Sequence, residues 1–102
     1  MLVEFTVMPV GTGESLGDAV SEIMKIIDES GLPYRVNPMG TVVEGNWEDV
    51  MALIRKCHDH VASKAPRIIT GIKIDDRPGK PMDRIVEKVK TLERRLGREL
   101  KK

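Results

Sequence analysis

Two stretches of the chain, residues 2–10 and 67–75, alternate between hydrophobic and polar positions. This alternation is the pattern of a β-strand with one buried face. The residues expected on that buried face are the apolar ones: Val3, Phe5, Val7, Ile68, Ile72 and Ile74. Glu4 and Lys73 fall on the opposite face. Between the two stretches, segments 34–37 and 41–44 flank a Pro-Met-Gly turn and predict a short β-hairpin.

Three other segments carry apolar residues at the spacing of an amphipathic helix. The first helix is expected at about 15–30 and ends at Gly31. The second begins after Asn46, a residue that can cap it, and its apolar stripe starts at Trp47. The third is expected at about 82–97, and its apolar stripe is interpreted as core or as a contact between subunits.

The resulting order, β-α-β-β-α-β-α, predicts an α+β protein with a four-stranded antiparallel sheet. Its first six elements match the ferredoxin-like split βαβ unit. In that fold the strand order is 4-1-3-2 and both helices cover one face of the sheet. The whole chain, residues 1–102, is then a single ferredoxin-like domain. The uncovered face has three interpretations: it is exposed to solvent, packs on another subunit, or lines a polar pocket between two sheets.

Composition excludes several classes of function. The net charge of +1, with acidic residues among the basic ones, argues against binding of nucleic acid. No apolar run approaches the length of a membrane span, and the first residues do not form a signal peptide. Only three aromatic residues occur, so the core is expected to be aliphatic. The single cysteine, Cys57, favours a reducing compartment, and we expect a cytoplasmic protein.

Polar groups concentrate around the predicted hairpin. Asn37 offers an amide, Thr41 a hydroxyl and Glu44 a carboxylate, within one turn and its flanks. Such groups match the amino group and ring nitrogens of an aminopyrimidine. The alternative is that Asn-Pro and Gly simply form a turn, and the spacing alone favours that alternative.

Other motifs carry less chemistry. Residues 11–15 are glycine-rich ahead of a helix and could hold an anion, but a plain loop and helix cap is favoured. His58 and His60 lie about 200° apart on a helix, and Cys57 faces the core, so we expect no metal site. No nucleophile–base or acid–base pair is visible, so we expect no enzyme activity and no cofactor.

Three segments together resemble the small thiamine-binding protein family of archaea, bacteria and yeast. They are Glu-Phe-Thr-Val-Met-Pro at 4–9, Met-Gly-Thr-Val-Val-Glu-Gly at 39–45 and Ile-Lys-Ile-Asp-Asp-Arg at 72–77. The resemblance covers residues 2–97. It implies a ferredoxin-like subunit in a dimer of dimers, hence a homotetramer, that binds thiamine or its hydroxymethylpyrimidine part without turnover.

The ligand contacts that the resemblance implies are Asn37, Met39, Gly40, Thr41, Glu44, Thr6 and Lys73. Among them, Glu44 is the group we expect to recognise the aminopyrimidine, because a carboxylate forms a charge-assisted hydrogen bond with a ring that takes up a proton. The alternative function is a structural or regulatory oligomer that binds another small metabolite.

Overall fold

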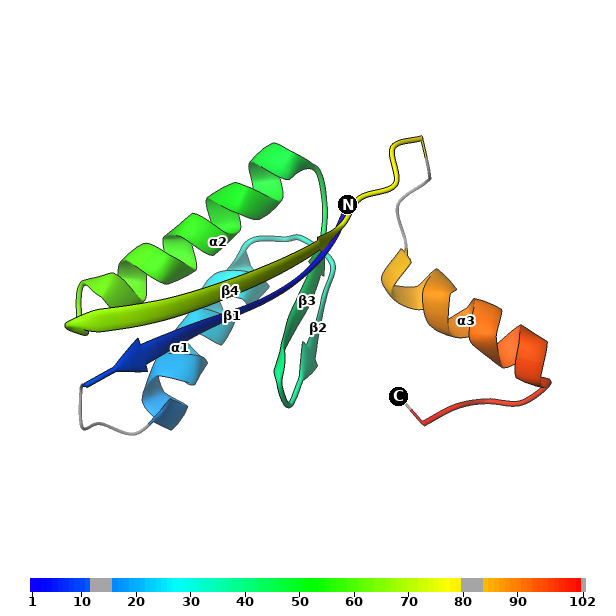
Figure 1. The fold of residues 1–102 in the computed structure, drawn as a ribbon, viewed down its shortest axis with the longest axis horizontal. Coiled ribbons are helices and arrows are strands. Elements are labelled where there is room, and N and C mark those ends of the chain that lie inside the picture. The colour runs from blue at the N-terminus through cyan, green and yellow to red at the C-terminus, as the bar shows by residue number, and fades with distance from the viewer. Residues whose placement is uncertain (12–15, 80–83, 102) are drawn as a thin grey trace.

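The computed structural model describes residues 1–11, 16–79 and 84–101. Its elements, in chain order, are β1 (Leu2–Val10), α1 (Leu16–Glu29), β2 (Tyr34–Asn37), β3 (Gly40–Glu44), α2 (Trp47–Ala62), β4 (Arg67–Asp75) and α3 (Arg84–Leu96). The strands form one antiparallel sheet in the order β2-β3-β1-β4. α1 and α2 lie together on one side of it (Figure 1). The predicted ferredoxin-like arrangement is therefore confirmed.

The predicted faces of the two long strands are also confirmed, with Glu4 and Lys73 on the side of the sheet away from α1 and α2. Glu4 lies opposite Lys73, and Phe5 lies opposite Ile72. Phe5 is 3% exposed and belongs to the apolar core between the sheet and the two helices, as expected from the alternation. The core is aliphatic apart from Phe5 and Cys57, and its fully buried members include Val3, Ile27, Val43 and Val50.

Helix α2 begins and packs largely as its sequence predicts. The side-chain oxygen of Asn46 accepts a hydrogen bond from the backbone N–H of Asp49 at 2.8 Å, which caps the helix. The expectation that Trp47 packs in the core is wrong, because its side chain is 54% exposed. As the first helical residue, Trp47 lies outside the buried stripe, which begins at Val50.

Coverage of β4 by α2 is incomplete. Ile72 and Ile74 face the helix side, as predicted, but they remain 42% and 38% exposed. β4 is the edge strand of the sheet, and the exposure of its helix-side isoleucines shows that this edge extends past the helix layer.

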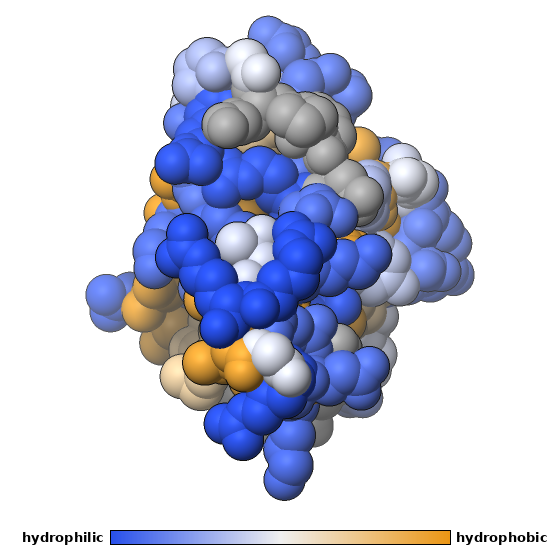
Figure 2. All heavy atoms as spheres, turned by 90° about the vertical axis from the view of Figure 1, so that its right-hand side faces the viewer, coloured by the Kyte–Doolittle hydropathy of each residue, from blue (hydrophilic) through white to orange (hydrophobic). Residues whose placement is uncertain are grey.

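Beyond its first turn, helix α3 stands apart from this two-layer body (Figure 1). None of its residues is buried, so the interpretation of its apolar stripe as core is wrong, and a subunit contact stays a prediction. The radius of gyration is 15.2 Å, against about 13 Å for a compact chain of 100 residues. Figure 2, seen from the α3 side, shows a mostly hydrophilic surface with small hydrophobic areas.

Two sequence predictions fall partly outside the described residues. They are the glycine-rich segment, of which the structure describes only Gly11, and the start of the last helix at 82–83. Gly31 follows α1 with a φ of +78°, the left-handed conformation expected of a glycine that ends a helix. Among the described residues, no helix is both long and apolar enough to cross a membrane.

Candidate functional site

The hairpin of β2 and β3 is shorter than the strand beside it. β3 pairs with β1 only from Leu2 to Phe5, whereas β4 pairs with β1 along its whole length from Leu2 to Val10. Beyond Phe5, β1 and β4 continue as a two-stranded ribbon past the end of the hairpin (Figure 1). Within the described part of the chain, this half of β1 has no strand partner on its hairpin side.

A pocket of about 250 Å³ lies at this point, between the hairpin turn, the second half of β1 and helix α1. We call it the hairpin pocket. Five of the seven residues predicted to contact a ligand line it: Thr6, Asn37, Met39, Gly40 and Thr41. The structure thus brings together residues that are up to 35 positions apart in sequence.

The polar groups of the hairpin pocket come from both faces of the sheet. Thr41 lies opposite Phe5 and therefore on the helix side, where it is 9% exposed. Its hydroxyl donates a long hydrogen bond of 3.8 Å to the Met24 sulfur. Thr6 and Asn37 alternate with these residues and belong to the other face. The pocket is therefore a notch at the edge of β1 with polar groups on both sides.

Apolar groups form most of the remaining wall of the hairpin pocket. They include the methionines Met8, Met24 and Met39, together with Val20 and Ile23 from α1. None of the described lining residues carries a charged side chain. Methionine side chains adapt their shape and make favourable contacts with aromatic rings. Such a pocket can bind a small, flat, uncharged ring and offer it one or two hydrogen bonds.

Glu44 is placed elsewhere, so the expectation that Asn37, Thr41 and Glu44 lie close together is wrong. Residues three apart on a strand point to opposite faces, and Glu44 therefore points away from Thr41. The Glu44 side chain is 2% exposed, and its two carboxylate oxygens accept the backbone N–H of Arg84 at 2.9 and 2.8 Å. One of them also accepts a longer bond of 3.4 Å from Ile85.

Glu44 therefore holds the first turn of α3 against the open face of the sheet. The carboxylate of Asp75, in the same row of the sheet, adds contacts to the side chains of Lys88 and, at 3.6 Å, Arg84. The hydrogen bond from Lys88 holds the pKa of Asp75 below its usual value. Sequence reasoning missed this attachment, although the odd spacing between Thr41 and Glu44 was a signal that they lie on different faces.

Lys73, the other predicted contact outside the hairpin pocket, is exposed on the open face opposite Glu4. A ligand contact by Glu44 or Lys73 stays a prediction, and the ligand would then have to bind at a site other than the hairpin pocket.

The cysteine and the two histidines do not converge. Cys57 is fully buried, and burial raises the pKa of its thiol to about 11. The Nδ1 atom of His58 lies 2.6 Å from the Thr70 hydroxyl, and the Nε2 atom of His60 lies 2.7 Å from the Glu22 carboxylate. Among the described residues, no group of three His, Cys, Asp or Glu side chains is placed to hold a metal ion.

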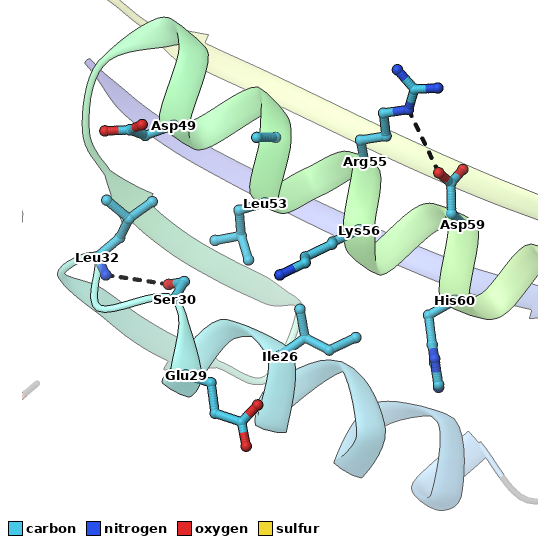
Figure 3. A pocket seen from close by; sticks show the side chains of 11 residues that line it. Ile26, Glu29, Ser30, Leu32, Asp49, Leu53, Arg55, Lys56, Asp59 and His60 are labelled. Atoms are coloured by element: carbon cyan, nitrogen blue, oxygen red, sulfur yellow. Dashed lines mark hydrogen bonds and ion pairs between the residues drawn. The ribbon is translucent and has the colours of Figure 1, made fainter.

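A second and larger hollow, about 990 Å³, lies between α1 and α2 and was not predicted (Figure 3). Ile26, Leu32 and Leu53 contribute apolar surface to it. Its charged side chains do not meet across the groove: Figure 3 shows Glu29 and Arg55 pointing away from each other, and Arg55 pairs with Asp59 of its own helix. A broad groove without converging polar groups is a weaker candidate for a small-molecule site than the hairpin pocket.

Comparison with known proteins identifies the family to which the chain belongs. Residues 3–93 match the model of the thiamine-binding protein family, so the chain belongs to that family. A UPF0045 protein of Mycobacterium tuberculosis is 43% identical over 99 residues, covering 96% of each chain. A UPF0045 protein of Synechocystis is 36% identical, over 91% of this chain and 77% of its own length.

Two solved structures are similar across the fold. A hypothetical protein from Methanocaldococcus jannaschii superposes with a TM-score of 0.80 at 27% identity, over 89% of this chain and 93% of that one. A Thermotoga maritima protein, described as a "putative thiamine biosynthesis/salvage protein", has a TM-score of 0.75 at 25% identity, over 89% of this chain and 96% of that one.

Proposed function

We propose that this protein binds thiamine, or its hydroxymethylpyrimidine part, in the hairpin pocket and releases it unchanged. The observation that carries the proposal is the gathering of Thr6, Asn37, Met39, Gly40 and Thr41 around one uncharged pocket. Membership of the thiamine-binding family and the description of the Thermotoga maritima relative support the class of ligand.

The size and chemistry of the hairpin pocket suit a pyrimidine ring. A volume of about 250 Å³ is at the small end of ligand pockets and fits one ring better than a nucleotide. The Asn37 amide can both donate and accept, so it can pair with an amino group and a ring nitrogen that lie side by side. Met24 and Met39 would then lie against the faces of the ring.

Binding without turnover is the simplest function for these groups. The predicted contacts that line the hairpin pocket are amide, hydroxyl, thioether and backbone groups, which do not transfer protons readily near neutral pH. The candidate nucleophile, Cys57, is buried elsewhere with a raised pKa, so little of it is thiolate at neutral pH. These features support a binding protein, which we place in the cytoplasm as a homotetramer.

Titration calorimetry with thiamine, hydroxymethylpyrimidine and hydroxyethylthiazole tests this proposal. We expect the first two to bind and the thiazole alone to bind far more weakly. Replacing Asn37 with alanine should weaken hydroxymethylpyrimidine binding by about 5- to 10-fold, the loss of one neutral hydrogen bond.

Two threonine variants complete the test. Thr41→Val removes a hydroxyl from the hairpin pocket and should also weaken binding, whereas Thr70→Val, the same change on β4, should not. Absence of binding by both pyrimidine compounds at millimolar concentration would contradict the proposal. Tighter binding of another metabolite would favour the alternative of a regulatory oligomer.

A further inference from the structure

The backbone groups of β1 point alternately to its two neighbours in the sheet. At the start of the strand, the carbonyl of Met1 accepts the N–H of Gly45 at 3.1 Å, and the Met1 amine donates to the Gly45 carbonyl at 2.6 Å. In an antiparallel pair, such doubly bonded positions recur at every second residue. The N–H and C=O groups of Val3, Phe5 and Val7 therefore point toward the hairpin of β2 and β3.

Val7 is the first of these residues without a partner strand. Phe5 pairs with Thr41, so the position opposite Val7 would be Met39. Met39 lies in the turn that joins β2 to β3, outside both strands. Within the described part of the chain, the N–H and C=O of Val7 form no hydrogen bond on this side, and Val7 lines the hairpin pocket. The pocket therefore contains a backbone donor and a backbone acceptor that the sheet holds side by side.

The next residue with this orientation is Pro9, which has no N–H to donate. Proline is accepted in a strand where the missing N–H would not pair with a neighbouring strand, which agrees with the orientation derived for β1. It also prevents a further strand from pairing along the second half of β1. The N–H of Val7 is thus the single backbone donor that β1 offers to the hairpin pocket beyond Phe5. This arrangement favours a small ligand over an added strand.

We propose that the backbone of Val7 recognises the ligand: its N–H donates to a ring nitrogen, and its C=O accepts from the amino group beside that nitrogen. This inference rests on the proposed function and specifies how the same pocket selects its ligand. The ligand class is a flat ring with an acceptor nitrogen next to an exocyclic amino group, as in the aminopyrimidine of thiamine. The ring would pair with β1 as an added strand does. The Asn37 amide stays available to the second amino hydrogen.

A backbone pair differs from a side-chain amide in one testable respect. The Asn37 amide can rotate by half a turn, so it can pair with an aminopyrimidine or with a pyrimidinone, whose edge offers a carbonyl beside a ring N–H. The backbone of Val7 cannot turn, because the groups of Thr6 and Met8 on either side point to β4 and pair with it. A pyrimidinone would therefore place donor against donor and acceptor against acceptor, and a site built for hydrogen bonds rejects such an analogue strongly.

Amide hydrogen exchange tests the geometry at this position. In the free protein, the amide of Val7 should exchange faster than those of Thr6 and Met8, although all three lie in one strand. Saturation with hydroxymethylpyrimidine should slow the exchange of Val7 and leave its two neighbours little changed. Equal protection of the three amides in the free protein, or unchanged exchange of Val7 in the saturated protein, would overturn the inference.

Calorimetry with two matched compounds tests the recognition itself. The wild-type protein is titrated with hydroxymethylpyrimidine and with its oxo counterpart, in which a carbonyl replaces the amino group. We expect the oxo compound to bind roughly 10- to 100-fold more weakly. Val7→Pro removes the N–H, which no strand uses, so a folded variant should bind hydroxymethylpyrimidine about tenfold more weakly and show a smaller preference between the compounds.

The outcomes separate this inference from the proposed function. Equal binding of the two compounds by the wild-type protein would overturn the role of Val7 and leave the proposed function intact. A folded Val7→Pro variant with unchanged affinity and preference would do the same. Absence of binding by either compound would contradict the proposed function, and this inference with it.

Discussion

Replacing Glu44 with glutamine is the change that separates the two roles open to this side chain. The substitution keeps the shape of a residue that is 2% exposed and removes its charge. In the structure, both carboxylate oxygens accept the backbone N–H of Arg84, and one also accepts that of Ile85. Glutamine keeps a single acceptor oxygen and turns an NH2 group toward donors that it cannot pair with.

We expect the substitution to weaken the attachment of α3 to the sheet. A carboxylate at a helix N-terminus contributes about 0.3–2 kcal/mol, and a buried donor left without its acceptor costs about 1–3 kcal/mol. We therefore expect the docking of α3 to weaken by about 1–3 kcal/mol, or about 5- to 150-fold in its opening equilibrium. The core between the sheet, α1 and α2 should remain intact, because no residue of α3 is buried in it.

Hydrogen exchange at the Arg84 and Ile85 amides measures this directly. Exchange should speed up in Glu44→Gln, while amides in the middle of β1 keep their protection. Glu4→Gln is the matched control, since Glu4 is an exposed carboxylate on the same face of the sheet. Unchanged exchange at both amides would refute the reasoning. If thiamine binding weakened in that variant without a change in exchange, Glu44 would regain its predicted role as a ligand group.

Three further expectations concern stability. Burial raises the pKa of Cys57 from 9.0 to about 11. The free energy of unfolding, measured by urea denaturation, should therefore fall as pH rises from 9.0 toward 11. The variant Cys57→Ala should not show this fall. Lys88 lowers the pKa of Asp75, so the stabilisation of α3 by this ion pair is fully present above pH 3.8 and is lost as pH falls through the lowered value. In hydrogen exchange, the amides of α3 should therefore lose protection in acid, and this loss should be smaller in Lys88→Met. Ile27→Ala should cost about 2–5 kcal/mol in denaturant unfolding, whereas Val86→Ala on exposed α3 should cost far less, and equal costs would contradict the assigned core.

Most of the fold could be predicted because each strand and helix of the body has one clearly apolar face. The alternation in residues 2–10 and 67–75 determined the buried face of each strand, whereas the pairing of Glu4 with Lys73 follows from the register that the structure shows. Trp47 could not be placed in this way. A hydrophobic residue at the first position of a helix fits the periodic stripe in sequence, but whether a neighbour covers it depends on where the helix starts relative to the sheet.

The candidate site was predicted in its composition but not in its geometry. The resemblance identified residues around the hairpin, and the structure gathers five of them at one pocket. The pocket exists because the hairpin is shorter than β1, a difference that sequence alone does not reveal until the pairing is known. Glu44 was misplaced because closeness in sequence was taken for closeness in space, although alternation along a strand separates it from Thr41.

The most direct test of the central claim is a titration of the isotope-labelled protein with hydroxymethylpyrimidine, followed by amide chemical shifts. Binding at the hairpin pocket predicts that the shifts concentrate at residues 6–8 and 37–41 and saturate together. Titration with hydroxyethylthiazole should move the same amides little. No shifts at millimolar ligand, or shifts concentrated in the groove between α1 and α2 or around Glu44, would contradict the assignment of the site.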